Sequence, residues 1–214
     1  MKPKVDYLFQ AGTKAYGPHL DLVSSLHGSY AKLHGLEYTV YRGPYPVSPW
    51  KDPGGIGSDQ GHKQYVLILE LLRKEDTGWV FWVDSDAMIV GNEDPRLVMD
   101  GHLVGMAWYP KNAKHAGHFH RGSFFLKAHP QVVELIERIL REGPGPRPHW
   151  DQGLLNKYLA EPQWKGKFKT LPIEWNSAVK HNDPEECVIR AWHGMGGIHK
   201  RFLMMQAEMQ RRGL

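Results

Sequence analysis

Short apolar runs alternate with amphipathic stretches along the chain, and this alternation predicts strands and helices in turn. The apolar runs are rich in β-branched and aromatic residues, which favour strands. They lie at Val5–Gly12, Glu37–Gly43, Trp79–Val83, Leu103–Tyr109 and Gly122–Ala128, with a further strand-like run at Cys187–Gly194. Because strands alternate with helices, we expect an α/β fold with a mainly parallel central sheet flanked by helices.

The amphipathic stretches place apolar residues three and four positions apart and carry residues typical of helix ends. Gly35 is expected to end one helix, and Ser58 is expected to cap another. The segments Pro44–Gly57 and Gly143–Pro148 are rich in proline and glycine, and both are interpreted as loops rather than as domain linkers. We expect helices over His19–Gly35, from Ser58, over Pro130–Gly143, from Asp151, and at the C-terminus up to Arg212.

Composition and charge narrow the class of protein. A chain of 214 residues with 41% hydrophobic and 23% charged residues can fill one globular core, which excludes wholesale disorder and predicts a single domain. The single cysteine, Cys187, excludes an intrachain disulfide and fits a reducing cytoplasm, where we expect the protein. We find no signal peptide and no run of about 18 apolar residues that would span a membrane. The formal charge of +4 is too small to identify an anionic partner.

Two carboxylates follow directly behind the most apolar run. Asp84 and Asp86 come immediately after Trp79–Val83, and a strand that continued through them would point both to the same face. Neighbouring carboxylates repel, so the pair requires a shared proton or a divalent cation unless it is a solvated strand end. Ligands of α/β sheets bind at the carboxyl ends of strands, which favours a site for Mg²⁺ or Mn²⁺ together with phosphate oxygens.

The phosphate-binding glycine loops GxxxxGKS/T and GxGxxG are missing from the sequence, so a cation would have to neutralise the phosphates. The haloacid-dehalogenase-like phosphatases carry DxDxT/V at a similar strand end. Here Met88 replaces the threonine or valine, and the motif lies far from the N-terminus. A metal-dependent phosphohydrolase is therefore the alternative and not the favoured interpretation.

Three downstream stretches follow the aspartates in order, at His118–Pro130, His149–Leu159 and Ala191–Phe202. Together with Tyr30–Tyr38 and with Lys63 ahead of an apolar helix, they resemble the GT-A glycosyltransferases. The glycogenin-like family and a family of galactosyl- and mannosyltransferases are the most similar in motif order, over roughly residues 5 to 200. The resemblance implies a single Rossmann-like GT-A domain that uses a nucleotide sugar, expected to be a UDP-sugar, and retains the anomeric configuration.

The resemblance also implies roles at the metal and the diphosphate. Asp84 and Asp86 match the DxD motif, and His193 matches a histidine that completes the metal site late in the chain. An imidazole beside two carboxylates suits Mn²⁺ better than Mg²⁺. Contacts with the nucleotide diphosphate are implied for Lys63, for Gly196, and for Lys200, since His199 stands where the relatives place a lysine.

Residues near the transferred sugar are implied as well. Asp151 and Gln152 match a DQ pair, in which Gln152 would face the anomeric carbon and Asp151 would bind sugar hydroxyls. The chain departs from the family at His120 and Arg121, which replace an asparagine and a threonine, and at Gly153, which replaces an acid. The identity of the donor sugar is therefore not predicted.

Two other groups of residues, a set of histidines and a basic segment, can be explained either as ordinary surface residues or as a binding site. His115, His118 and His120 could bind zinc, but without a nearby cysteine or acid they are interpreted as polar loop residues. The segment Trp164–Lys169 alternates cations with aromatic residues, as nucleic-acid surfaces do, although a solvated basic loop is the favoured interpretation.

We therefore expect a metal-dependent glycosyltransferase that moves a sugar to a hydroxyl acceptor. Two kinds of acceptor remain possible. One is a hydroxymethylated pyrimidine in DNA, which small viral glycosyltransferases modify, and the other is a glycan or lipid-linked acceptor. The DNA hypothesis rests on a basic face around the crevice and on a tryptophan that holds a flipped base. The tryptophans concerned are Trp164 and Trp175, and the cations are Lys165, Lys167 and Lys169, with Arg121, Lys200, Arg201, Arg211 and Arg212. A non-catalytic nucleotide-sugar-binding module is the alternative outside the enzymes.

Overall fold

The computed structural model describes residues 3–44, 58–109, 118–143, 150–179 and 184–214. Residues 45–57 and 144–148 of the two predicted loops lie outside this part of the chain, as does His115. The side chains of His118 and Asp151 also lie outside it, although the backbone of both residues is described.

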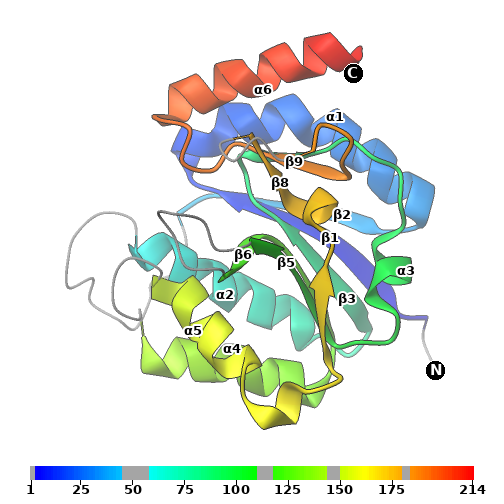
Figure 1. Ribbon diagram of the computed structural model, residues 1–214, viewed down its shortest axis with the longest axis vertical. Helices are drawn as coiled ribbons and strands as arrows, with labels where there is room; N and C mark the ends of the chain where they lie inside the picture. The colour runs from blue at the N-terminus through cyan, green and yellow to red at the C-terminus, as the bar shows by residue number, and fades with distance from the viewer. Residues whose placement is uncertain (1–2, 45–57, 110–117, 144–149, 180–183) are drawn as a thin grey trace.

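A six-stranded sheet forms the centre of the molecule, in the order β2-β1-β3-β6-β5-β7 (Figure 1). Its strands are β1 (Val5–Gly12), β2 (Glu37–Arg42), β3 (Thr77–Val83), β5 (Val104–Tyr109), β6 (His118–Lys127) and β7 (Phe168–Leu171). Strand β6 runs antiparallel to both of its neighbours, and the other pairs are parallel. The predicted α/β fold with a mainly parallel sheet is confirmed, with β6 as the exception.

Helices cover both faces of this sheet (Figure 1). One face carries α2 (Ser58–Leu72), α4 (Pro130–Glu142) and α5 (Trp150–Leu159). The other carries α1 (Gly17–His34), and α6 (Ile198–Arg212) packs on the outer side of α1. Gly35 ends α1 in the left-handed conformation at φ 64°, as its position in the sequence predicted.

Short helical segments complete the fold at Lys14–Tyr16, Pro95–Met99 (α3), Pro162–Trp164 and Ile173–Asn176. The predicted helix boundaries agree with the structure to within two residues at Gly17, Ser58, Pro130, Trp150 and Arg212. Over the residues that the structure describes, no helix combines the length and the apolar character needed to cross a lipid bilayer.

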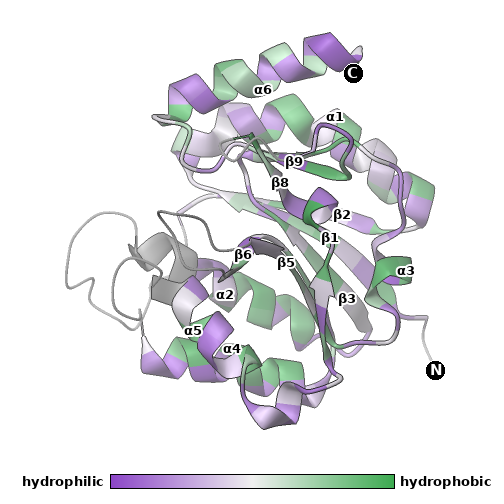
Figure 2. Cartoon of the chain, viewed as in Figure 1, coloured by the Kyte–Doolittle hydropathy of each residue, from purple (hydrophilic) through white to green (hydrophobic). Residues whose placement is uncertain are grey.

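The unbroken apolar run of β3 is explained by burial on both faces. Trp82 packs with Phe9 and Phe124 beneath α2, α4 and α5, whereas Phe81 packs with Phe125 on the opposite face. Successive strand residues point to opposite faces, so a strand covered on both sides needs apolar residues at every position. Figure 2 shows this hydrophobic character along the strands and the inward sides of the helices.

A second sheet of three short strands lies on the α1 side of the central sheet. Its strands are β4 (Ala87–Ile89), β9 (Ile189–Ala191) and β8 (Ser177–Ala178), in the order β4-β9-β8. Strand β4 runs antiparallel to β9, with Ala87 opposite Ala191. The pairing brings the residues just before β4 next to those just after β9, which lie about a hundred positions later in the chain.

Candidate functional site

Asp84 and Asp86 lie in the turn between β3 and β4. Strand β3 ends at Val83, where the amide of Asp84 donates to the carbonyl oxygen of Gly122 at 2.8 Å. The amide of Ala87 then donates to the carbonyl oxygen of Asp84 at 3.1 Å and closes the turn. The expectation that strand alternation points both carboxylates to one face is therefore wrong, because the strand stops before them. The turn brings the two carboxylates together.

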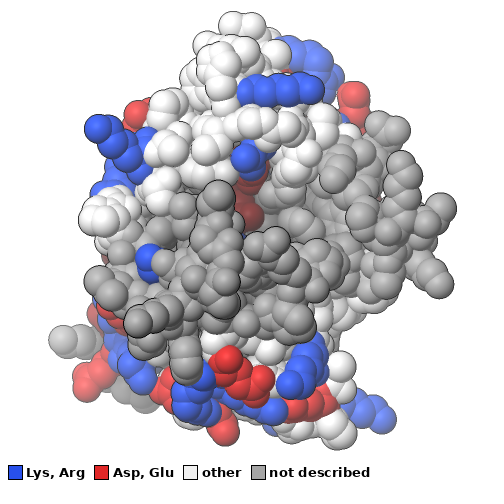
Figure 3. Space-filling model, turned by 90° about the vertical axis from the view of Figure 1, so that its left-hand side faces the viewer, with Lys and Arg blue, Asp and Glu red and all other residues white. Residues whose placement is uncertain are grey.

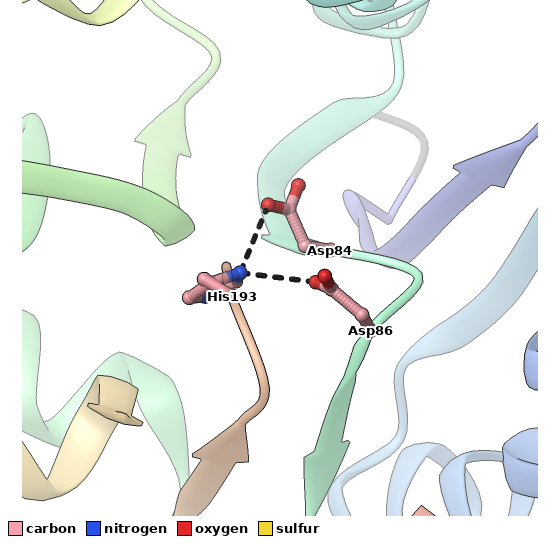
Figure 4. Close-up of side chains that lie close together, drawn as sticks. All are labelled: Asp84, Asp86 and His193. Atoms are coloured by element: carbon pink, nitrogen blue, oxygen red, sulfur yellow. Dashed lines mark ion pairs between the residues drawn. The ribbon is translucent and has the colours of Figure 1, made fainter. Parts of the chain in front are cut away.

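His193 completes a three-residue cluster with the two aspartates (Figure 4). Its Nδ1 lies 3.0 Å from Oδ1 of Asp86 and 3.7 Å from Oδ2 of Asp84. Pairing of β4 with β9 positions the ring, since the amide of Trp192 donates to the carbonyl oxygen of Asp86 at 3.0 Å. One ligand atom from each residue lies within 4.8 Å of the other two, so these side chains can share one cation.

The electrostatics of the cluster favour a positive charge between the carboxylates. Burial raises the pKa of Asp84, although the charges of Arg121 and His193 and a 2.8 Å hydrogen bond from Nε1 of Trp82 oppose it. Burial also opposes ionisation of Asp86, but His193 and Arg201 together hold its pKa well below the usual range. Asp86 and Asp84 raise the pKa of His193 against the effect of burial. A proton on Nδ1 of His193 would lie between the carboxylates, where a metal ion would otherwise bind.

Hydrogen bonds from behind orient the ring of His193. Its Nε2 lies 3.4 Å from Oδ1 of Asn176, whose Nδ2 in turn donates to Nδ1 of His120 at 3.0 Å. The amide of Gly122 donates to the same Nδ1 of His120, also at 3.0 Å. Nδ1 of His120 is therefore engaged within this network, and Nε2 is the ring nitrogen that the two hydrogen bonds leave for another partner. The side chains of His115 and His118 lie outside the described residues, so the histidine-cluster hypothesis is not tested.

A buried network supports the aspartate turn from below. Nε2 of Gln10 donates to the carbonyl oxygen of Asp84 at 3.2 Å, and Oε1 of Gln10 accepts from the hydroxyl of Tyr38 and from Nδ1 of His27, each at 2.8 Å. Nε2 of His27 accepts from the amide of Ile89 at 2.9 Å. Burial lowers the pKa of His27 to about 3, so the ring stays neutral and satisfies both partners.

Arg201 is a site residue that the sequence did not reveal as such. Its guanidinium pairs with Oδ2 of Asp86 and lies 5.5 Å from the ring centre of Tyr16. From the sequence it was expected only as one of several cations of a basic face around the crevice, without a role of its own. Its neighbour Lys200, the predicted diphosphate ligand, is exposed, and the stem of Lys200 lies beside Gly196. His199 is exposed as well.

The remaining predicted site residues lie on α2 and α5, and each of these helices contacts Arg121 of β6. Gln152 is buried, and its Oε1 accepts from the amide of Arg121 at 3.4 Å. The guanidinium of Arg121 donates to Oε1 of Gln64 at 2.6 Å, next to the half-buried Lys63 in α2. Asp151 precedes Gln152 in the first turn of α5. Arg121 thus links the DQ pair to the DxD turn, because its charge acts on Asp84.

The lysines of the DNA hypothesis lie at the opposite edge of the sheet. Phe168–Leu171 forms strand β7, parallel to β5, and Phe168 pairs with Val104 at the amino-terminal end of both strands. The carboxylates follow the carboxyl end of β3, so Lys165, Lys167 and Lys169 do not line the crevice. The prediction that these three lysines contribute to a basic face around the crevice is wrong. Lys165–Lys167 is exposed, as a solvated loop predicts, but from Phe168 the segment is a strand.

The two tryptophans of that hypothesis are core residues. Trp164 is 3% exposed and packs in the core beneath α4 and α5, and Trp175 is 5% exposed with its ring 5.4 Å from that of Phe125. Neither side chain is free to hold a base that has left a duplex.

A cavity of about 630 Å³ lies at the carboxyl ends of β1 and β2, on the edge of the sheet where β3 leads into the aspartate turn. Its lining residues are Thr13, Lys14, Gly17, Arg42, Gly43 and Pro44. Tyr16, which lies under the guanidinium of Arg201, belongs to the same segment as the first three. The volume is in the range of small-molecule sites. Figure 3 shows acidic atoms recessed in a hollow on this side of the molecule, with basic atoms next to them.

The chain was compared with known protein families, curated proteins and solved structures, and only solved structures match. No family model matches the chain, and no curated protein matches it. A glycosyltransferase involved in the glycosylation of the major capsid of PBCV-1 has a TM-score of 0.72 at 13% identity, over 94% of this chain and 99% of that one. The glycosyltransferase GlyE of Streptococcus pneumoniae TIGR4 has a TM-score of 0.55 at 13% identity, over 98% of this chain, which spans 64% of that protein. The chain therefore has the fold of these two glycosyltransferases, in agreement with the GT-A resemblance of its sequence.

Proposed function

We propose that the protein is a metal-dependent glycosyltransferase that moves a sugar from a nucleotide sugar, a UDP-sugar in the first instance, to a hydroxyl acceptor. The observation that carries the proposal is the cluster of Asp84, Asp86 and His193 at the carboxyl ends of the sheet, at the same edge as a cavity of nucleoside size. The fold is shared with two glycosyltransferases, which supports this use of the cluster over phosphohydrolysis.

The cluster would hold Mn²⁺, or Mg²⁺, through two carboxylates and Nδ1 of His193. Such an ion, when bound, draws negative charge from the departing nucleoside diphosphate. To offer Nδ1, His193 must give up the proton that it shares with Asp86 and keep its second proton on Nε2. Oδ1 of Asn176 lies 3.4 Å from Nε2 and is the acceptor that favours this tautomer.

Gln152 and Asp151 are proposed to face the sugar. Burial of Gln152 and its contact with the Arg121 amide hold its side chain in one place, as a residue beside an anomeric carbon requires. We propose that the anomeric configuration is retained. NMR of the first-formed product tests this, because an inverted anomeric signal would require a general base and would exclude retention.

For the acceptor we favour a glycan or lipid-linked hydroxyl over hydroxymethylated DNA. Lys165, Lys167 and Lys169 lie at the opposite edge of the sheet and both tryptophans lie in the core. Arg121 and Arg201 are the cations of that hypothesis that act on the aspartates. Incubation of DNA containing 5-hydroxymethylcytosine with UDP-sugars and Mn²⁺, followed by mass analysis of the nucleosides, should show no added hexose. A hexose-shifted nucleoside would reverse this preference.

The experiment that tests the proposed function is a screen of nucleotide sugars for slow donor hydrolysis, with and without Mn²⁺. Release of UDP and free sugar only in the presence of metal, and its loss in Asp86→Asn, is the expected result. Binding of donor without any hydrolysis would favour a binding module. Phosphate release from simple phosphate esters would favour the phosphohydrolase.

A further inference from the structure

Arg201 extends from the first turn of α6 into the aspartate–histidine cluster. Its guanidinium pairs with Oδ2 of Asp86 and lies over the ring of Tyr16. The side chain is 16% exposed, and its Nε has no hydrogen-bond partner among the residues that the structure describes. A guanidinium has five N–H donors, so Arg201 retains the capacity to bind a second anion while it pairs with Asp86.

Arg201 also lies between the two regions that a nucleotide sugar would occupy. Asp86 is on one side of the guanidinium, and Tyr16 is on the other, in the segment that lines the 630 Å³ cavity with Thr13 and Gly17. A nucleotide with its base in that cavity and its diphosphate at the carboxylates would have the guanidinium within reach, because Arg201 contacts both Asp86 and Tyr16. The N-terminus of α6, whose N-cap Gly197 makes no side-chain cap hydrogen bond, adds positive potential there.

The charges in the cluster imply an exchange of partners. Without a metal ion, Asp86 is balanced by Arg201 at one oxygen and by His193 at the other. A divalent ion at the same carboxylate would place two further positive charges beside the guanidinium, and like charges disfavour this arrangement. A diphosphate bound together with the ion would offset this repulsion, because the guanidinium could pair with its negatively charged oxygens.

We propose that Arg201 binds the diphosphate of the donor and exchanges Asp86 for phosphate oxygens when metal and donor bind together. The proposal rests on the proposed function, and it assigns to Arg201 the role that the sequence gave to Lys200. Its consequence is a defined coupling: Arg201 weakens the binding of the metal alone and strengthens the binding of the nucleotide with the metal.

Calorimetry of Mn²⁺ alone, and of UDP at saturating Mn²⁺, tests this coupling in the wild type and in Arg201→Gln. We expect Arg201→Gln to bind Mn²⁺ alone at least as tightly as the wild type and to bind UDP about tenfold or more weakly. Arg201→Lys keeps the positive charge but loses the paired N–H groups of the guanidinium, so its UDP affinity should fall between those of the wild type and Arg201→Gln. Arg212→Gln is the matched control on the same helix, since Arg212 pairs with Glu208 at the other end of α6 and should change neither affinity.

The outcomes separate the role of Arg201 from the proposed function. If Arg201→Gln leaves UDP affinity unchanged, or lowers both affinities and the melting temperature together, Arg201 is structural and the inference is wrong. Loss of UDP affinity in Lys200→Gln but not in Arg201→Gln would return the role to Lys200. If the wild type binds UDP with Mn²⁺ in any of these cases, the proposed function stands. A wild type that binds neither Mn²⁺ nor UDP would remove both proposals.

Discussion

The imidazole of His193 fills the space in which Gly122 would carry a side chain. A Cβ built on Gly122 would overlap Nε2 of His193, well inside the 3.0 Å that real Cβ atoms keep, and would lie 3.0 Å from Oδ1 of Asn176. Strand β6 therefore forms the back wall of the cluster. The missing side chain at position 122 lets the ring lie against this strand while its Nδ1 faces the two carboxylates.

Gly122→Ala should displace His193 and weaken metal binding. The added methyl group cannot be accommodated without movement of the ring or of the strand, so we expect Mn²⁺ affinity to fall at least about tenfold. The measurement is calorimetric titration with Mn²⁺, together with the melting temperature. Gly28→Ala is the control, because a Cβ there would meet only the Tyr38 ring at 3.8 Å. Equal Mn²⁺ affinity in Gly122→Ala and the wild type would mean that His193 is not a ligand.

Asp86→Asn and His193→Ala should each abolish metal binding in a folded protein. Each removes one of the three ligand groups, and we expect the dissociation constant for Mn²⁺ to rise more than about 100-fold. Asp100→Asn, at the exposed end of α3, is the control for loss of a carboxylate. Undiminished Mn²⁺ binding in Asp86→Asn, with an unchanged circular dichroism spectrum, would place the metal elsewhere.

Metal binding should strengthen as the pH rises through the pKa of His193. The carboxylates raise that pKa above 6.5, so at lower pH a metal ion must displace a proton from Nδ1. We expect Mn²⁺ affinity to increase up to about tenfold per pH unit below the raised pKa and to level off above it. Calorimetry in buffers of different ionisation enthalpy measures the released proton. His193→Gln, which cannot hold that proton, should release none.

The buried, neutral ring of His27 should lower the free energy of unfolding as the pH becomes acidic. Its folded pKa of about 3 lies below the unfolded value of 6.5, so between these values the unfolded state binds the extra proton. The unfolding free energy should therefore fall as the pH drops from 7 to 5, by about 2 kcal/mol from this group.

Urea unfolding at pH 7 and pH 5 measures the contribution of His27 as the difference between wild type and His27→Gln. The variant should be less stable at pH 7, because the amide of Ile89 loses its acceptor, and less sensitive to pH. His199→Gln removes an exposed histidine and should leave the pH dependence as it is in the wild type. An identical pH dependence in His27→Gln and wild type would contradict the assignment.

Local patterns in the sequence predicted the parts of this structure that depend on local chemistry. The apolar run before Asp84 predicted a strand buried on both faces, and glycine at position 35 predicted the end of α1, because burial and backbone conformation restrict the residues allowed there. The resemblance to GT-A glycosyltransferases implied that His193 joins Asp84 and Asp86, and the structure brings the three together.

The parts that were missed depend on pairings between distant segments. Strands β4, β8 and β9 have only two or three residues each, too few for a periodic signal. Arg201 looks like any surface arginine until α6 packs on α1 and directs it to Asp86. The lysines before β7 were assigned to the wrong edge because the direction of a four-residue strand is set by its partner β5 and cannot be recognised from its own sequence.

The separation of 115 residues between Asp86 and Arg201 has a consequence for biosynthesis. A growing chain emerges from the ribosome with its N-terminal part first, so β3 and the two aspartates are exposed long before their partners exist. Until His193 and Arg201 follow, the carboxylates have neither the imidazole nor the guanidinium to balance them. Nascent chains and fragments that stop short of His193 should therefore lack the third ligand, and the ability to hold a metal ion marks a chain whose synthesis has passed residue 193.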